Sequence, residues 1–285
     1  MRNDFAVFIC THGRSDKQLT LDTLLKAGYT GEWYLVLDDT DKTIQQYIDN
    51  YGVEHIIVFD KNHYINNCTD TGDNKGHYKC ILYAKNAVED IAKSLKLKAF
   101  MMVDDDIVGL RFRTYKDGKF GTVRLKNVDK VMDAYIEYML SCNMTTIGFG
   151  APISVVRFGY EDEKTMCYCR TPYQIYLRNA SKPVDWVGWY GEDNITMLLD
   201  ESRGGYWTSV PYMQYDTVEV STNASGGMAQ EYANNTSFEL AFNIKRALPS
   251  CMTIRPNKRR TKYLTILSRR CAFPLLISDS YRRVQ

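Results

Sequence analysis

Four apolar runs near the start of the chain each end in polar side chains, and this repetition narrows the possible folds more than any other feature. The runs are FAVFIC, WYLVL, HIIVF and FMMV, and helical periodicity lies between them. Strands that alternate with helices form parallel sheets with right-handed crossovers. We therefore predict an α/β fold with a mostly parallel central sheet flanked by helices and a smaller mixed region in the second half.

The carboxyl ends of these strands are the predicted position of a ligand site. Parallel strands end at one edge of a sheet, and open α/β sheets bind ligands there. Thr11, Asp39 and Asp104 follow three of the runs, so we expect them to meet at that edge. A Rossmann dinucleotide site is disfavoured because no GxGxxG follows the first run.

The acidic triplet Asp104, Asp105 and Asp106 is the strongest candidate for chemistry. Adjacent carboxylates repel one another, and inside a compact domain they need a cation, oriented donors or water. Asp104 and Asp106 are alternate residues that can converge on a divalent cation, and hard oxygen ligands favour Mg²⁺ or Mn²⁺ over zinc. The alternative is a solvated acidic turn that binds nothing.

Predicted helices at 17–27, 43–51 and 78–97 separate the first four runs, and the polar segment Tyr64 to Gly76 is interpreted as a loop. In the second half, Asp117-Gly118 predicts a hairpin turn, and residues 128–142 and 237–247 predict helices.

The segment WVGWYGEDNITMLL is the second candidate for chemistry. Glu192 and Asp193 begin a predicted helix, where acids can simply complement the helix dipole. Beside a site that binds a metal and a nucleotide, the same acids can deprotonate an incoming hydroxyl, and Trp186, Trp189 and Tyr190 can stack on a sugar or base. The segment alone leaves both interpretations open.

Charge is distributed unevenly along the chain. Residues 245–285 hold eleven Lys and Arg against one acid, a charge of +10 in a chain whose net charge is +2. Such a basic end suggests a polyanionic partner, although it can also be a solvated face of a terminal element. We divide the chain into residues 1–110, residues 111–244 of the same domain, and a basic extension at 245–285.

Eight cysteines without a CxxC pair and only four histidines disfavour a zinc site. No signal peptide and no apolar stretch of membrane length are visible in the sequence. We therefore expect a soluble protein of the reducing cytoplasm with no membrane partner. The sequence does not indicate an oligomeric state.

The strand ending in THGR, the LDD, the YAKN helix, the VDDD and the GED occur in an order that resembles the GT-A nucleotide-sugar glycosyltransferases. More narrowly, the stretch from FICTHGRSDK to YLVLDD, the TDTGD loop and the GED segment resemble the TET-associated glycosyltransferases of phages. The resemblance covers about residues 5 to 235. It implies a GT-A-like fold and the transfer of a sugar from a UDP-sugar to a hydroxymethylated pyrimidine in DNA. Residues 1–110 would then be the nucleotide-sugar-binding half of the domain, and residues 111–244 the acceptor-binding half. For a phage enzyme it also implies the host cytoplasm.

The resemblance also implies roles for individual residues. Thr11 and Asp39 match positions that hold uracil and ribose, and Arg14 is a possible diphosphate contact. Asp104 and Asp105 match contacts to the nucleotide and sugar, and the metal would be held by Asp106 with Asp104. Asp193, or with less support Glu192, matches the catalytic base, which implies inversion at the sugar carbon. Further donor-side candidates are Gly13, Asp38, Asp73 and Lys79.

On the acceptor side, Trp186, Trp189 and Tyr190 are candidates to hold an exposed base, and the predicted phosphate contacts are Arg259, Arg260, Arg269 and Arg270. One departure concerns the metal, because many GT-A enzymes use a late His ligand and this chain has none after His77. Water, phosphate or Asn223 would then complete the ligand shell.

Three other functions are compatible with parts of this pattern. One is a glycosyltransferase with a protein or glycan acceptor, and another is a non-catalytic nucleic-acid-binding module on the same fold. The third, a sugar nucleotidyltransferase, is disfavoured because no glycine-rich basic loop follows the first apolar run.

Overall fold

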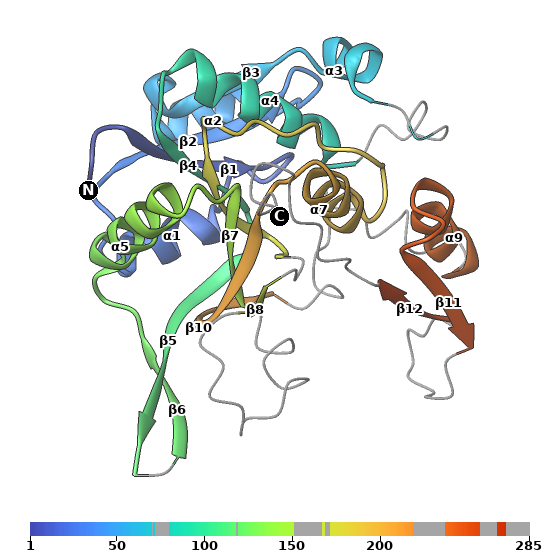
Figure 1. Ribbon diagram of the computed structural model, residues 1–285. Coiled ribbons are helices and arrows are strands. Elements are labelled where there is room, and N and C mark those ends of the chain that lie inside the picture. The colour runs from blue at the N-terminus through green and yellow to red at the C-terminus, as the bar shows by residue number, and fades with distance from the viewer. Residues whose placement is uncertain are drawn as a thin grey trace.

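Figure 1 shows the computed structural model of the chain, which describes residues 1–69, 71, 80–117, 119–150, 167–168, 172–218, 237–256 and 267–271. The strands are β1 (Phe5–Cys10), β2 (Glu32–Asp38), β3 (Ile56–Phe59), β4 (Ala99–Asp104), β5 (Ile107–Lys116), β6 (Lys119–Arg124), β7 (Thr146–Gly150), β8 (Cys167–Tyr168), β9 (Ile175–Asn179), β10 (Trp207–Thr217), β11 (Met252–Pro256) and β12 (Leu267–Cys271). The helices are α1 (Leu19–Lys26), α2 (Ile44–Tyr51), the 3₁₀ turn η1 (Val53–His55), α3 (Lys61–Asn67), α4 (Leu82–Ser94), α5 (Val128–Ser141), α7 (Glu192–Ser202) and α9 (Ser237–Ala247).

A single central sheet joins most of the strands, in the order β3-β2-β1-β4-β9-β7-β10-β5-β6, with β8 paired to β10. The pairs β3–β2, β2–β1 and β1–β4 are parallel. Beyond β4 the sheet becomes mixed, because β9 runs antiparallel to both β4 and β7. The predicted α/β fold, with parallel strands at the core of the sheet and a mixed second half, is confirmed.

Helices cover both faces of the parallel strands, which explains why those strands are apolar on both sides. Phe5, Val7 and Ile9 of β1 pack in a core cluster with α1 and α5. The alternate residues Ala6 and Phe8 pack in a second cluster with α4 and α7. Figure 1 shows α1 and α5 together on one side of these strands and α4 on the other.

The segment after β3 differs from the sequence-based prediction. We expected a loop from Tyr64, but residues Lys61–Asn67 form α3. The Asp60 side chain caps this helix by accepting a hydrogen bond from the His63 N–H at 3.0 Å. Tyr64 and Ile65 pack against the α4 side of the core. These apolar contacts and the cap stabilise a helix in a segment whose polar composition predicted a loop.

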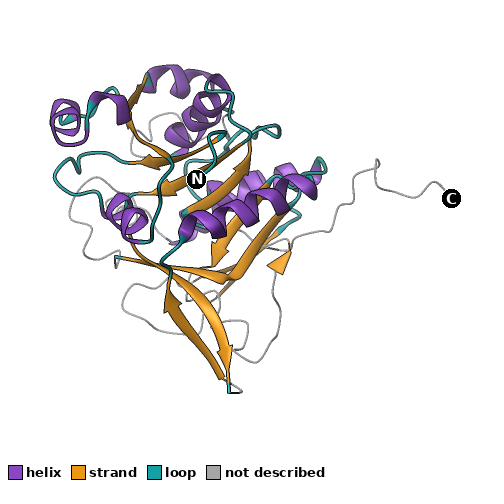
Figure 2. Ribbon diagram, turned by 90° about the vertical axis from the view of Figure 1, so that its left-hand side faces the viewer, coloured by secondary structure: helices purple, strands orange, loops and turns teal. Residues whose placement is uncertain are grey.

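The predicted hairpin is confirmed, and its strands β5 and β6 form a ribbon that projects from the body of the molecule (Figure 2). Strand β5 begins directly after the acidic triplet, so the ribbon and the candidate site share one chain segment. At the other end of the chain, α9 packs against the two-stranded sheet of β11 and β12 (Figure 1). In the part of the chain that the structure describes, no helix has the length and apolar character needed to cross a membrane.

A buried ion pair fastens α4 to β9. Arg178 has 0% exposure, and its Nε donates to Glu89 Oε1 at 2.9 Å. The guanidinium also donates to Thr146 Oγ1 at 2.6 Å and to the Lys182 carbonyl at 3.0 Å. Burial raises the pKa of Glu89, while the Arg178 charge opposes that rise. Each member of the pair would be an uncompensated buried charge without the other.

We expect Arg178→Met to destabilise the protein by about 3–5 kcal/mol, because it leaves Glu89 buried without its cation. The double variant Glu89→Leu/Arg178→Met is expected to recover most of that loss. Urea unfolding measures both free energies, and Arg203→Met, at an exposed position after α7, is the matched control. An Arg178→Met variant as stable as this control would contradict the expectation.

Candidate active site

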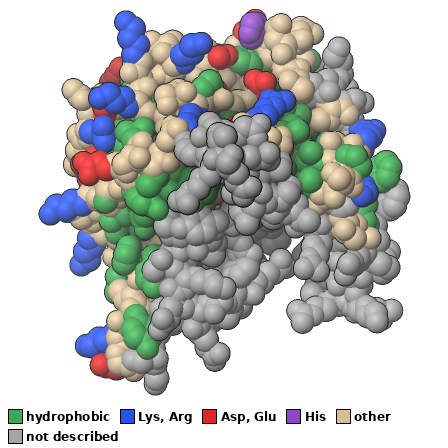
Figure 3. Space-filling view, in the orientation of Figure 1, with side chains coloured by type: hydrophobic (Ala, Val, Ile, Leu, Met, Phe, Trp, Pro, Cys, Tyr) green, Lys and Arg blue, Asp and Glu red, His purple; other side chains and the backbone are tan. Residues whose placement is uncertain are grey.

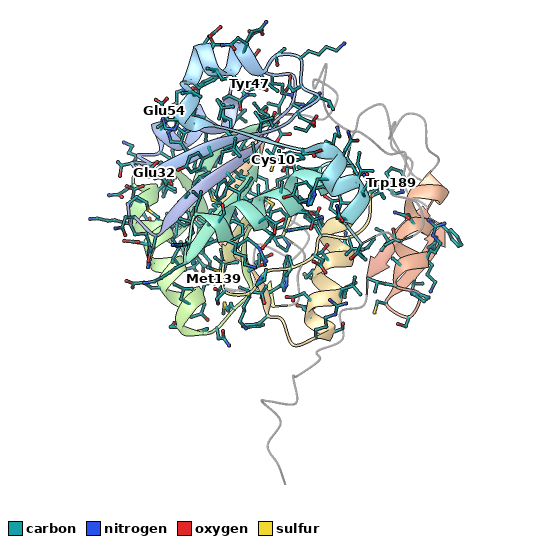
Figure 4. All side chains as sticks on the ribbon, turned by 90° about the horizontal axis from the view of Figure 1, so that it is seen from above. Cys10, Glu32, Tyr47, Glu54, Met139 and Trp189 are labelled. Carbon is teal, nitrogen blue, oxygen red and sulfur yellow. The ribbon has the colours of Figure 1, made fainter. Side chains whose placement is uncertain are left out.

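The loop after β1 is tied to the acidic triplet. Cys10, labelled in Figure 4, is in register with Asp104, and Thr11 follows it. Thr11 Oγ1 donates to Asp105 Oδ2 at 2.7 Å, and the Arg14 guanidinium forms an ion pair with Asp105 Oδ1. The prediction that the ends of β1 and β4 meet at one edge is confirmed.

The three carboxylates of the triplet have different surroundings. Asp105 is buried, and burial raises its pKa while Arg14 and Thr11 oppose the rise. Asp104 and Asp106 are only partly buried. Asp105 therefore holds the 11–14 loop against β4, and the two alternate carboxylates of the triplet remain the candidates for binding a ligand.

The two aspartates at the end of β2 also differ. Asp38 is buried, with its Oδ2 at 3.0 Å from His12 Nδ1 and at 3.3 Å from Lys61 Nζ. Asp39 is exposed, and its Oδ1 accepts a hydrogen bond from the Lys61 N–H at 3.0 Å. Of the two, Asp39 is therefore the one that can reach a ligand in solvent.

Charge and hydrogen bonds set the ionisation of Asp38 and His12. Burial acts to raise the pKa of Asp38, but hydrogen bonds from His12 and Thr40 and the Lys61 charge bring it well below its ordinary value. The Asp38 carboxylate raises the pKa of His12. Gly13, in the same loop, donates its N–H to Asp41 Oδ2 at 2.7 Å. The loop is thus held by the carboxylates of Asp38 and Asp41, at and just after the end of β2.

Helix α7 presents the second pair of candidate acids. Gly191, immediately before it, has φ +72°, and a Cβ there would lie 2.5 Å from Ile244 Cδ1 of α9. Glycine is therefore required for the chain to enter α7 beside α9. Glu192 and Asp193 form the first turn of the helix, where the dipole favours negative charge.

Both acids converge on Lys85, a buried residue of α4. Lys85 Nζ lies 2.9 Å from Glu192 Oε1 and 2.6 Å from Asp193 Oδ1. Burial acts to lower the pKa of Lys85, but the charges of Asp193 and Glu192 outweigh it and raise the pKa. Burial and the neighbouring Asp193 raise the pKa of Glu192, against the opposing charge of Lys85.

Electrostatic interaction links these acids to the triplet. Burial raises the pKa of Asp104 well above its ordinary value; Lys85 opposes the rise, whereas the charges of Asp106 and Asp193 add to it. Asp104, at the end of β4, is therefore close enough to Asp106 of the following turn and to Asp193 at the start of α7 for their charges to interact. Among the residues that the structure describes, no group of three or more His, Cys, Asp or Glu side chains is arranged to hold a metal.

Sequence reasoning did not find Lys85, although a signal was present. Leu82, Lys85, Glu89 and Ala92 recur at helical spacing, and all four are buried. Two charged residues on the inward stripe of a helix require buried partners. For Lys85 those partners are the GED acids, and for Glu89 the partner is Arg178.

The structure places the predicted acceptor aromatics in the core. Trp186, Trp189 and Tyr190 have exposures of 0%, 5% and 8% and pack in the α4-side cluster. Figure 4 shows Trp189 on the side of the molecule that α9 occupies. A fully buried ring has no face for a ligand, so this structure contradicts the stacking role predicted for Trp186.

Several predicted site residues lie outside the described part of the chain: Asp73, Lys79, Asn223, Arg259 and Arg260. Arg269 and Arg270 are on β12, in register with Ile254 and Thr253. On the face in Figure 3, the described Lys and Arg side chains are spread over the upper, left and right parts rather than gathered over one element.

Comparison with known proteins identifies the family of the chain. A sequence model of the TET-associated glycosyltransferases matches residues 5–227, which is most of the chain. The protein is therefore a glycosyltransferase. It belongs to the TET-associated glycosyltransferase family. No curated protein sequence matches the chain.

Solved structures show only distant likeness. Glucosyl-3-phosphoglycerate synthase from Mycobacterium tuberculosis, in complex with Mn²⁺, UDP and phosphoglyceric acid, has 10% identity and a TM-score of 0.43, with coverage of 95% of this chain and 88% of that one. GalNAc-T7 with UDP, GalNAc and Mn²⁺ has 10% identity and a TM-score of 0.39, with coverage of 79% and 46%. Likenesses this distant do not identify the ligands of the present chain.

We expect Asp38→Asn to lower the pKa of His12, because the carboxylate that stabilises the imidazolium is removed. In the native protein the raised pKa means that protonated His12 stabilises the fold at acidic pH, and this contribution is lost as pH rises through the raised pKa. NMR titration of the His12 ring measures the shift. Asp39→Asn is the matched control, and an equal effect of both substitutions would contradict the assignment.

Proposed function

We propose that the protein transfers a sugar from a UDP-sugar to the hydroxyl of a hydroxymethylated pyrimidine in DNA. The observation that carries the proposal is the family match over residues 5–227, and the electrostatic interaction of Asp104 with Asp106 and Asp193 supports it. Their excess of negative charge suits a divalent cation beneath a diphosphate. The carboxylate of Asp193 suits the removal of a proton from an acceptor hydroxyl.

The donor is proposed to bind along the ends of β1, β2 and β4. Thr11 and the exposed Asp39 would contact the nucleoside, and Arg14 would approach the diphosphate. The ion pair between Arg14 and Asp105 already places that guanidinium beside the triplet. Gly13 and the buried Asp38 then act by holding the loop rather than by touching the nucleotide.

Asp104 and Asp106 are the residues proposed to hold the cation. Carboxylate oxygens are hard ligands suited to Mn²⁺ or Mg²⁺, and a cation there would stabilise the negative charge of Asp104, which burial and then repulsion by Asp106 and Asp193 disfavour. Phosphate oxygens and water would complete the ligand shell. When bound, such a cation stabilises the negative charge that develops on the departing diphosphate.

The acceptor hydroxyl is proposed to lose its proton to Asp193 as its oxygen attacks the anomeric carbon. The new glycosidic bond forms while the bond to the UDP oxygen breaks, so the electron pair leaves with UDP and the sugar carbon is inverted. Asp193 is favoured over Glu192 as the base. Glu192 is more deeply buried, and its pKa is raised by burial and by Asp193.

A DNA acceptor is supported by the charge of the chain and by the family name. Residues 245–285 carry eleven Lys and Arg against one acid. Phosphate contacts by Arg259, Arg260, Arg269 and Arg270 would make binding weaken steeply with salt. DNA retention that is insensitive to salt would favour a protein or glycan acceptor instead.

The test is incubation with hydroxymethylated DNA, Mn²⁺ or Mg²⁺ and a panel of nucleotide sugars, followed by mass spectrometry of the nucleosides. We expect a hexose-sized mass gain on the modified pyrimidine and release of UDP. Asp193→Asn and Asp106→Ala are each expected to reduce the rate by at least roughly 100-fold, because they remove the base and a cation ligand. Asp49→Asn, at an exposed position of α2, is the matched control and should retain full activity. Absence of UDP release with every donor, or full activity of Asp106→Ala, would overturn the proposal.

A further inference from the structure

Two pairs of residues join α4 to β9 beneath the candidate base. Lys85 and Glu89 lie one helical turn apart on α4, and Tyr176 and Arg178 lie two residues apart on β9. Lys85 Nζ lies 3.3 Å from the Tyr176 hydroxyl, and Arg178 Nε lies 2.9 Å from Glu89 Oε1. The helix and the strand are thus connected at two successive levels.

Trp186 lies between these two levels. Its ring packs edge-on against Tyr176, with centroids 5.0 Å apart, and Lys85 Nζ lies 4.5 Å from the Trp186 ring centroid. The indole Nε1 donates to Glu89 Oε1 at 3.2 Å. Its backbone N–H donates to Asn86 Oδ1 at 3.0 Å. Trp186 therefore fixes the spacing of the two pairs, which accounts for its complete burial.

The first pair extends to Asp193 of α7. Lys85 Nζ lies 2.6 Å from Asp193 Oδ1, and the Tyr176 hydroxyl donates to the same oxygen. Two donors from different elements on one oxygen restrict the rotation of the carboxylate. The Asp193 side chain retains 17% exposure, so it is anchored on one oxygen without being sealed from solvent.

We propose that Tyr176 and Lys85 are positioning residues for Asp193, and that Trp186 with the Glu89–Arg178 pair holds them in place. The inference rests on the proposed function, in which Asp193 removes the acceptor proton. A base delivers its full effect only when it is held in the productive geometry, and a misplacement of about 1 Å can cost roughly 100-fold in rate.

The decisive variant is Tyr176→Phe, which removes one hydroxyl from an otherwise unchanged ring. We expect kcat to fall by about 10-fold to 100-fold while the KM for the sugar nucleotide stays within about 2-fold, because only the base is displaced. Tyr138→Phe, on α5 at the opposite face of the sheet, is the matched control and should change neither quantity.

A second variant distinguishes an effect on the position of the base from a loss of structure. Lys85→Met leaves two acids without their cation and can unfold the site, so its thermal unfolding and UDP binding are measured together with its rate. Bound UDP combined with a lost rate would support positioning. If Tyr176→Phe keeps the native kcat, the positioning role is overturned while the proposed function stands. An Asp193→Asn variant with native activity overturns the proposed function and this inference together.

Discussion

The buried ammonium of Lys85 is the constraint on which the candidate site depends. A cation taken out of water costs several kcal/mol unless carboxylates and hydrogen-bond acceptors surround it. Glu192 and Asp193 meet this need from α7, more than one hundred residues away in sequence, and the Tyr176 hydroxyl is a third contact. The same ion pairs place the first turn of α7 beside the end of β4. The ion pairs that neutralise the buried Lys85 therefore also position the acids of the proposed catalytic centre.

The site lies where the parallel half of the sheet meets the mixed half. On the side of the β1 strand, Asp105 uses its carboxylate to hold Thr11 and Arg14, so the middle residue of the triplet is structural. On the side of α7, α4 and β9 hold Asp193 through Lys85 and Tyr176. Two sets of buried polar contacts thus fix the two sides independently. This division suits a reaction in which two substrates must approach the same point from different directions.

Sequence patterns predicted the elements better than the partners of individual side chains. The first four strands, the hairpin at Asp117 and the helix of α5 were predictable, because hydrophobic periodicity and turn residues are local signals. Helix α3 was missed, since its stability comes from one cap and from contacts of Tyr64 and Ile65 with the core. Trp186 was assigned to a ligand because an aromatic residue beside acids looks the same in sequence whether it is buried or exposed. The separation of Asp38 from Asp39 likewise required the positions of His12 and Lys61.

The sequence by itself determined that the chain alternates strands and helices, that acidic residues follow the fourth strand and begin a later helix, and that family motifs occur in order. These properties are carried by neighbouring residues, so they can be read without coordinates. The tertiary structure alone decided that Lys85 forms ion pairs with the two acids of α7, that Thr11 and Arg14 bind the Asp105 carboxylate, and that the Trp186 ring is buried. Each of these facts depends on segments far apart in the chain, and burial decides which charges must pair. No local sequence pattern indicates which of these charges pair.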